Sequence, residues 1–430
     1  MATFQRTLRG IKLKHLKHTA YTGTVEMPLP ARVRIPLRQH IGAACLPLVA
    51  KGDRVLAGQK IGDSDAFVSA PVHASISGTV AGIEWLELPQ GRAEAVVIDS
   101  DGLGERIQAE PPRAEDLPSF LAAVRESGLV GLGGAGFPTH VKLGYRDIDR
   151  VHTLVVNAAE CEPYITSDNR ECVETPEDVI EGIELVRRFT GIRRAIIVTE
   201  SNKLGAARIL RECAGTAPIA VKVLRSIYPK GAEKVAVFEA TGIAVEDGKL
   251  PADCGVIVLN VTTVAEIARY LRTGVPLIRK RITIDGDVLR KPMNAYAAIG
   301  TPVEDVMRLG AVDEERLRMI VMGGVMMGAC AADYQYPVLK STNAVLFFQR
   351  LQERNKSACI RCSRCIAVCP LKLMPAALER AYDARDAGAL RRLRVNVCMN
   401  CGCCTYVCPA KRDLAHKNSL AKQFLKQGGG

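Results

Sequence analysis

Eight of the fifteen cysteines in this 430-residue chain fall into two copies of one spacing. Each copy reads Cys-x2-Cys-x2-Cys-x3-Cys-Pro, and the second begins 39 residues after the first. The eight are Cys359, Cys362, Cys365, Cys369, Cys398, Cys401, Cys404 and Cys408. Thiolates at this spacing bind iron, because three of them reach three corners of a [4Fe–4S] cubane while the fourth cysteine of each run binds the other cluster. The spacing therefore predicts two clusters that share their ligand runs.

The expected ligand sets follow from this interlocked arrangement. One cluster is expected on Cys359, Cys362, Cys365 and Cys408, and the other on Cys398, Cys401, Cys404 and Cys369. Zinc is the alternative metal, but zinc sites use paired Cys-x2-Cys elements and rarely show three evenly spaced cysteines before a fourth. Cys403 lies opposite Arg364 when the two runs are aligned, so we expect it to bind no iron. Clusters held this close together pass single electrons.

The composition excludes several other classes of protein. Apolar residues make up 48% and charged residues 24%, which is typical of a soluble globular chain and excludes global disorder. A disulfide scaffold is typical only of small secreted chains. The net charge of +12 raises the question of nucleic acid, but aromatic residues are only 5% of the chain and no motif that reads bases accompanies the charge. We therefore expect no nucleic-acid partner.

The sequence shows no sign of export or membrane insertion. No run approaches the roughly 18 apolar residues of a membrane-spanning helix. Basic residues recur from Arg6 to Lys17, where a leader would have an apolar stretch. We therefore expect a cytosolic chain. Its basic runs, residues 1–18, 385–394 and 411–426, are either solvated surface or docking sites for acidic subunits or anionic lipid.

Four units are predicted along the chain, and residues 1–110 form the first. In this unit short Val/Ile runs are broken by Gly and Pro, a pattern typical of β-structure, and the run resembles the barrel-sandwich of biotinyl and lipoyl domains. Those carrier domains present a lysine on a hairpin, whereas residues 62–66 contain none. A structural or docking barrel is therefore expected.

Residues 113–273 alternate between strand and helix patterns. Expected strands cover residues 153–157, 195–199, 220–224 and 256–260, and expected helices cover residues 177–190, 204–213, 232–240 and 265–272. This alternation predicts a doubly wound parallel sheet with helices on both faces. Residues 274–348 are expected to form a small α+β unit, and residues 349–430 a helical domain that carries the cysteine runs.

Candidate ligand-binding residues gather at strand ends of the α/β unit. A glycine-rich loop, residues 131–139, opens the unit, and its spacing matches neither a Walker loop nor a regular G-x-G-x-x-G fingerprint. Such a loop lets backbone N–H groups approach a phosphate or a flat ring, although a simple turn explains it equally well. Residues 157–163 and 260–263 follow two strands, at the edge where α/β sheets bind ligands. Helix capping is the alternative role for Thr262 and Thr263.

Taken together, these segments resemble a known family. Residues 131–138, 157–163, 228–234, 250–253 and 260–263 are similar to the flavoprotein subunit of NADH-quinone oxidoreductase, and still more similar to the C subunit of the Rnf complex, an ion-translocating ferredoxin:NAD oxidoreductase. Residues 38–43, 67–73 and 323–328 resemble the same subunit. The likeness covers nearly the whole chain in the same domain order, and it implies that residues 274–348 are β-grasp-like, of the soluble-ligand-binding type. Residues 9–15 depart from the family's Gly-Gly-x-His-Pro-Pro segment.

The resemblance implies where cofactors bind. FMN would lie on Gly131, Gly133, Gly134, Lys142, Asn157, Asn260 and Thr263, and NADH would stack on the flavin near Glu160, Glu162 and Glu233. No catalytic base is assigned, because flavin N5 accepts hydride directly from nicotinamide and the cofactor carries the chemistry.

The resemblance also implies a function and a setting. Electrons would pass between NADH and a ferredoxin-linked chain, with FMN exchanging two electrons for single electrons that run through two [4Fe–4S] clusters. The implied partners are the other membrane and peripheral subunits of an Rnf-type complex, which couples this transfer to Na+ or H+ movement, and ferredoxin indirectly. The chain would be a peripheral subunit on the cytoplasmic side of the cell membrane.

Two other functions remain open on the sequence. A soluble NADH-dependent flavin and iron–sulfur reductase of the same family would serve cobalamin or an amino-acid reductase, although cobalamin-reductase relatives place the barrel after the flavin domain. A non-catalytic assembly or relay protein would keep the clusters and lack flavin.

Overall fold

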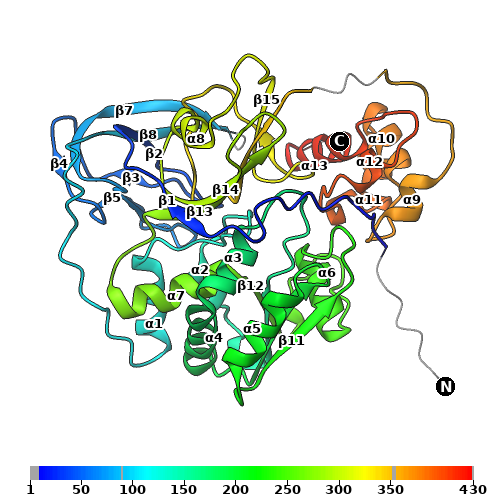
Figure 1. Ribbon diagram of the computed structural model, residues 1–430. Helices are drawn as coiled ribbons and strands as arrows, with labels where there is room; N and C mark the ends of the chain where they lie inside the picture. Colours follow the sequence, from blue (N-terminus) through cyan, green and yellow to red (C-terminus); the bar gives the residue numbers. More distant parts are fainter. Residues whose placement is uncertain (1–8, 89–90, 351–354, 429–430) are drawn as a thin grey trace.

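The computed structural model describes residues 9–88, 91–350 and 355–428. Its α/β unit, drawn in cyan to green in Figure 1, is built on a parallel sheet of four strands. The strand order is β11-β10-β9-β12. The strands are β9 (Thr153–Asn157), β10 (Arg194–Glu200), β11 (Ile219–Leu224) and β12 (Val256–Asn260). The chain runs outward from β9 to β11 and then returns to the other side of β9. The prediction of a doubly wound parallel sheet is therefore confirmed.

Helices cover both faces of this sheet because its strands are apolar on both sides. Leu154 and Val156 lie in a core with α4, α5 and α7, whereas Val155 between them points to the other face and packs in a separate core with α6. The helices of this unit are α1 (Leu117–Glu126), α2 (Thr139–Leu143), α3 (Ser167–Glu174), α4 (Pro176–Thr190), α5 (Leu204–Ala214), α6 (Glu233–Thr241) and α7 (Val261–Thr273).

Two small sheets form the barrel-sandwich near the N-terminus. The first has the order β2-β8-β7-β4 and the second the order β3-β5-β6. Their bounds are β2 (Arg32–Pro36), β3 (Leu46–Pro47), β4 (Arg54–Val55), β5 (Lys60–Asp63), β6 (Val72–His73), β7 (Gly78–Leu88) and β8 (Gly91–Ser100). Val33 and Ile98 of the first sheet and Ile61 and Val72 of the second share one buried core, so the two sheets close on each other.

A mixed sheet of six strands forms the third unit, in the order β1-β14-β13-β17-β15-β16. Its elements are β1 (Thr24–Glu26), β13 (Arg279–Gly286), β14 (Met293–Ala298), β15 (Met319–Met322), β16 (Ala329–Cys330), β17 (Ala344–Phe348) and the covering helix α8 (Val303–Gly310). The edge strand β1 comes from the segment before the barrel and pairs with β14. The N-terminal segment thus completes this sheet. The predicted domain boundaries stay a prediction.

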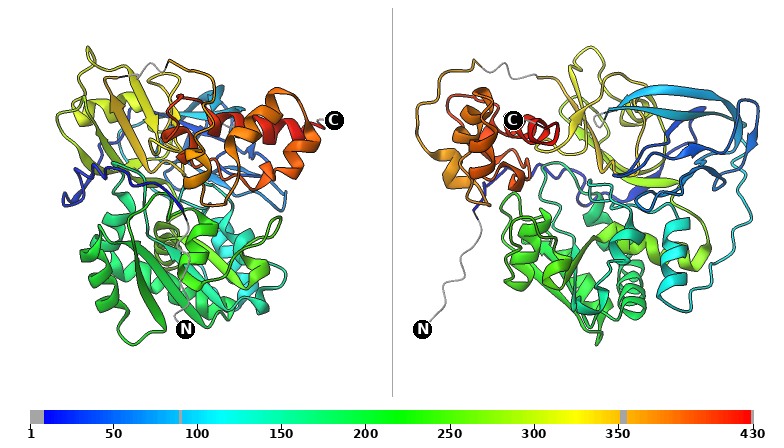
Figure 2. Two further views of the ribbon diagram at one scale, coloured as in Figure 1. Left: turned by 90° about the vertical axis from the view of Figure 1, so that its right-hand side faces the viewer. Right: turned by 180° about the vertical axis from the view of Figure 1, so that it is seen from behind.

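The C-terminal domain is a compact set of helices beside the other units (Figures 1 and 2). The helices are α9 (Arg364–Val368), α10 (Pro375–Asp383), α11 (Ala387–Arg392), α12 (Cys403–Tyr406) and α13 (Leu414–Lys426). Leu378, Leu390, Val395 and Ala421 form its apolar core. In the described parts of the chain no helix has both the length and the apolar character needed to cross a membrane.

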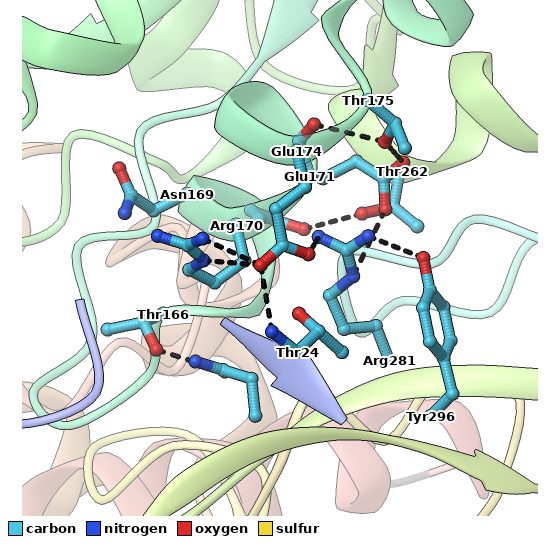
Figure 3. A network of polar contacts seen from close by, with 12 residues as sticks. Thr24, Thr166, Asn169, Arg170, Glu171, Glu174, Thr175, Thr262, Arg281 and Tyr296 are labelled. Carbon is cyan, nitrogen blue, oxygen red and sulfur yellow. Dashed lines mark hydrogen bonds and ion pairs between the residues drawn. The ribbon is translucent and has the colours of Figure 1, made fainter. Parts of the chain in front are cut away.

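Buried charges join the α/β unit to the six-stranded sheet (Figure 3). The Glu174 carboxylate of α3 accepts a hydrogen bond from the Thr24 N–H of β1 (2.8 Å) and pairs with Arg281 of β13 (3.1 Å). Glu171, whose side chain is fully buried, lies 3.7 Å from the same guanidinium. Removing one partner of a buried pair leaves an uncompensated charge, so this network resists any displacement of the two units.

The crossing of α4 and α7 depends on a glycine. A Cβ at Gly182 would lie 1.8 Å from the Val264 carbonyl oxygen, whereas a Cβ at Gly205 in α5 would meet nothing within 4 Å. We expect Gly182→Ala to destabilise the protein by about 1–3 kcal/mol through overpacking. Gly205→Ala is expected to be neutral or stabilising by up to about 1 kcal/mol. Thermal unfolding midpoints of both variants test this, and equal midpoints would contradict the close approach.

Candidate functional site

Two asparagines stand side by side at the carboxyl edge of the parallel sheet. Asn157 ends β9, Asn260 ends β12, and the two residues are direct register partners. These two strands flank the point where the winding of the sheet reverses. Open α/β sheets bind ligands in the crevice at this switch point. The sheet therefore places both predicted flavin residues at its natural binding edge.

Each asparagine is oriented by its neighbours and keeps one amide hydrogen free. Asn157 donates one to the Gly231 carbonyl (2.7 Å). Asn260 donates one to Asp168 (2.7 Å), and its Oδ1 caps α7 by accepting from the Thr262 and Thr263 N–H groups. A side-chain amide carries two hydrogens, so each residue retains one donor for a ligand. The alternative of a helix cap at Thr262 or Thr263 is therefore wrong, because Asn260 is the cap and both threonines lie inside α7. Capping and ligand binding are compatible roles for Asn260.

The glycine-rich loop is fixed against this edge. Thr263 is fully buried, and its Oγ1 accepts a hydrogen bond from the Leu132 N–H (3.0 Å). A Cβ at Gly133 would come within 3.2 Å of the Asn260 Cβ, so the loop backbone passes close to the asparagine. Gly134 has φ +111° and open space where a Cβ would be, which leaves this part of the loop accessible to a flat ring or a phosphate. The loop and the two asparagines therefore place amide donors beside an unobstructed stretch of backbone at this edge.

The three predicted acids have different surroundings. Glu233 forms an ion pair with Lys142, so these two predicted residues meet beside the glycine-rich loop. Glu160 is buried, its Oε1 accepts from the Asp168 N–H (2.7 Å), and its Oε2 lies 3.8 Å from Lys17. Burial raises the pKa of Glu160 to about 7. Glu160 is therefore held mainly by protein partners.

Glu162 joins two units. Its Oε2 accepts a hydrogen bond from the Met326 N–H (3.0 Å), and a side chain at Gly324 would collide with its carboxyl group. Burial raises the pKa of Glu162 to about 7. The structure therefore brings Gly133, Asn157, Asn260 and the Lys142–Glu233 pair to the sheet edge but commits Glu162 to the loop at residues 323–328.

One predicted cluster set converges on a single pocket. The pocket is lined by Cys369, Cys398, Cys401, Cys403 and Cys404, together with apolar residues such as Leu373 and Met399. Four of these five cysteines are the predicted set, and Cys369 comes from the other run as the interlocked pattern requires. The neighbouring Cys403 thiol lowers the pKa of Cys401 to about 7. The ligand sets themselves stay a prediction.

The two cysteine runs also share their backbone geometry. Positive φ angles occur at Arg361, Ser363 and Lys372 and recur 39 residues later at Asn400, Gly402 and Lys411. The turn that closes each run repeats as well, since the Lys372 backbone N–H donates to the Cys369 carbonyl and the Lys411 backbone N–H donates to the Cys408 carbonyl (both 3.1 Å). Two copies of one fold around two similar groups explain this repetition. In the described residues no three acidic, His or Cys side chains converge closely enough for a single metal ion, whereas a cubane binds each sulfur at a separate corner.

Sequence reasoning missed three positioning residues. Asp168 fixes the Asn260 amide, Lys17 donates to the Glu160 and Glu162 carbonyls (2.8 and 2.9 Å), and Lys203 donates to the Ala159 carbonyl (2.7 Å). Lys17 lies in a basic run that the sequence presents as solvated surface or as a docking site. These roles depend on contacts between distant segments, and no local pattern indicates them.

Comparison with known proteins agrees with this geometry. Residues 124–269 match the Nuo51 FMN-binding domain, residues 5–103 the RnfC barrel sandwich hybrid domain, and residues 352–409 a 4Fe-4S dicluster domain. The crystal structure of an NAD+-reducing [NiFe]-hydrogenase in the H2-reduced state has a similar fold, with a TM-score of 0.50 and 19% identity over 72% of this chain and 61% of that one. The fold and site define a flavin and iron–sulfur redox protein.

Two relatives narrow this class. The chain is 37% identical to the C subunit of the proton-translocating ferredoxin:NAD(+) oxidoreductase complex of Clostridium ljungdahlii, over 84% of this chain and 81% of the relative. It is 39% identical to the C subunit of the Na(+)-translocating ferredoxin:NAD(+) oxidoreductase complex of Acetobacterium woodii, over 82% of both chains. The chain therefore belongs to the family of Rnf C subunits, and the predicted resemblance is confirmed.

Two cysteines that line the same pocket have different predicted roles, because Cys404 is expected to bind iron and Cys403 is not. We expect Cys404→Ser to lower bound iron by about half, because it removes a corner ligand of one of two clusters. Cys403→Ser, a change in the same buried pocket, is expected to leave iron content unchanged. Iron and sulfide analysis with EPR after anaerobic reconstitution measures both. Equal iron loss in the two variants would contradict the assignment.

The buried Glu162 carboxyl predicts a pH effect on stability. Its folded pKa of about 7 lies above the ordinary value of 4.5, so the unfolded chain releases the proton first as pH rises. Stability that is present at low pH is therefore lost between about pH 4.5 and 7. Glu162→Gln replaces the titratable carboxyl with a neutral amide. As the pH rises from about 4.5 to 7, the thermal unfolding midpoint of this variant is therefore expected to fall less than that of the parent. The exposed Glu315→Gln serves as control, and parallel curves for Glu162→Gln and the parent would refute the effect.

Proposed function

We propose that this chain transfers electrons between NADH and a ferredoxin-linked chain, as the C subunit of an Rnf-type ion-translocating complex. In this proposal it is a peripheral subunit on the cytoplasmic side of the cell membrane, and its partners are the other membrane and peripheral subunits of that complex. Two relatives support the proposal, because their names assign them to ferredoxin:NAD(+) oxidoreductase complexes. The FMN-binding and dicluster domains are the parts that such a transfer needs.

One observation carries the proposal: the loop of residues 228–231 lies between two parts of the site. On one side is the carboxyl edge of the parallel sheet, here called the flavin edge, and on the other is the pocket lined by Cys369, Cys398, Cys401, Cys403 and Cys404, here called the cysteine pocket. Asn157 donates to the Gly231 carbonyl at one end of this loop, and the Cys403 sulfur lies 4.0 Å from the Tyr228 carbonyl oxygen at the other. Tyr228, Cys401 and Cys403 share a buried apolar cluster with Ile11. Electron transfer falls steeply with distance, so this placement gives electrons a short path through the protein.

The residues of the site have separate tasks. The loop amides and the free hydrogens of Asn157 and Asn260 would hold FMN, with Lys142 and Glu233 beside it. FMN, when bound, supplies the exchange between hydride transfer and single-electron transfer. The apolar cluster around Tyr228 excludes water from the path between the flavin edge and the cysteine pocket.

Burial gives the two cysteine sets an order. Cys401 and Cys404 are buried, and Cys401 packs in the cluster with Tyr228, whereas Cys359 and Cys362 are exposed. A cluster on the buried set would receive electrons from the flavin, and a cluster on the exposed set would exchange them with a partner. The direction of net flow depends on the potentials of the donor and acceptor.

Anaerobic reconstitution tests the proposal. We expect the chain loaded with iron, sulfide and FMN to show flavin absorbance, and NADH to bleach it and to generate EPR signals of reduced clusters. A chain that binds clusters but no flavin would be a relay protein. Cofractionation with a soluble reductase in place of membranes would favour the soluble-reductase function.

Asn157 offers a specific variant of this experiment. We expect Asn157→Ala to reduce FMN retention by about ten-fold or more, because it removes a ligand donor and the hydrogen bond to the Gly231 carbonyl. The control is Asn202→Ala. Asn202 follows the neighbouring strand β10, and its exposed amide contacts His15 and Lys203. FMN fluorescence after gel filtration measures retention, and equal retention in both variants would remove Asn157 from the site.

A further inference from the structure

The exposed cysteine set lies on an outer surface of the C-terminal domain. Helix α9, which contains Cys365, stands at the right-hand edge of the molecule in Figure 1. Cys359 and Cys362 are exposed, in contrast to the buried Cys401 and Cys404. A cluster on the exposed set would therefore be accessible to a second redox protein.

This surface carries four cations that have no anionic partner. Residues 355–378 contain four basic residues and no Asp or Glu. Within the described chain the side chains of Arg361, Arg364, Lys372 and Lys411 make no hydrogen bond or ion pair. Nearby basic residues differ, since Lys356, Arg412 and Lys417 are paired with Asp413, Glu379 and Asp383. The unpaired cations are therefore available to an external partner.

Exposed apolar side chains lie among these cations. Ile360 is 65% exposed and stands between Cys359 and Arg361. Tyr406 is 53% exposed, ends α12 and lies two residues before Cys408. Helices α9 and α12 contact each other, which brings the two runs together. An apolar centre with a polar rim is the usual anatomy of a protein interface.

We propose that the surface formed by residues 359–364 with Tyr406 and Lys411, here called the exchange face, docks an acidic iron–sulfur protein or domain whose own cluster is exposed. This inference rests on the proposed function and adds the site and chemistry of its electron partner. One electron passes between the two clusters; no bond forms or breaks and no proton moves. The unpaired cations select a partner with an acidic surface. Ile360 and Tyr406 form the apolar centre of the contact, from which water is excluded. A lipid surface would match the charge but would offer no redox centre to the exposed cysteines.

Charge reversal on the exchange face tests the proposal. The probe is a small acidic ferredoxin with two [4Fe–4S] clusters, mixed anaerobically with the full chain carrying FMN and both clusters. The variant is Arg361→Glu/Arg364→Glu. The matched control is Lys51→Glu/Arg208→Glu, which makes the same change in net charge on exposed residues of the barrel and of α5.

We expect the exchange-face variant to weaken binding of the oxidised proteins and to slow transfer from dithionite-reduced chain by about ten-fold or more at low ionic strength. Added salt should reduce the difference from the parent. The control is expected to stay within about two-fold of the parent. EPR of each reduced variant verifies that both clusters are intact.

Three results would overturn the proposal. The first is unchanged binding and transfer in the exchange-face variant, and the second is an equal loss in the control variant. The third is an exchange-face variant that no longer binds phosphatidylserine vesicles but still binds ferredoxin. Because the transfer assay starts from dithionite-reduced protein, it is independent of NADH. Failure of NADH to reduce the parent chain would instead count against the proposed function.

Discussion

The buried contact between the α/β unit, here called the flavin unit, and the C-terminal domain, here called the cysteine domain, is the constraint on which the rest of the structure depends. The Tyr228 carbonyl faces Cys403, and Ile11 exchanges two backbone hydrogen bonds with Tyr228, both 2.9 Å. Gly10 makes this possible, because a Cβ there would lie 2.3 Å from the Tyr228 carbonyl oxygen. Three segments distant in sequence thus meet at one buried point. An electron path between two cofactors needs such a fixed contact.

Other contacts keep this point in place. The N-terminal segment reaches the cysteine domain through Arg9, which donates to the Ile366 carbonyl (3.2 Å). It then pins residues 160–165 through Lys17 and ends as β1 in the six-stranded sheet. Glu162 ties the flavin unit to the loop at Met326, which in turn lies against Gly402. The ion pair between Asp247 and Arg394 adds a surface contact between the flavin unit and the cysteine domain. The α/β unit, the six-stranded sheet and the C-terminal domain are therefore each held by the other two.

Local patterns predicted much of this molecule, and long-range contacts account for the rest. Strands β9 and β12 occupy the expected residues because buried parallel strands are short apolar runs with clear ends. The cysteine spacing predicted a set that lines one pocket, since ligand geometry restricts spacing. In contrast, β1 has three residues, none of them buried, and its partner strand lies far along the chain. No local signal marks such a strand, nor the partners of Lys17 and Glu162. The ligand sets, the flavin residues and the domain boundaries stay predictions.

A structure of the chain loaded anaerobically with FMN and both clusters tests the central claim most directly. Our account predicts FMN at the carboxyl ends of β9 and β12, with the cluster on Cys398, Cys401, Cys404 and Cys369 across the Tyr228 loop and the second cluster farther out. Flavin bound away from this edge, or the cluster on Cys359, Cys362, Cys365 and Cys408 as its nearer neighbour, would contradict it.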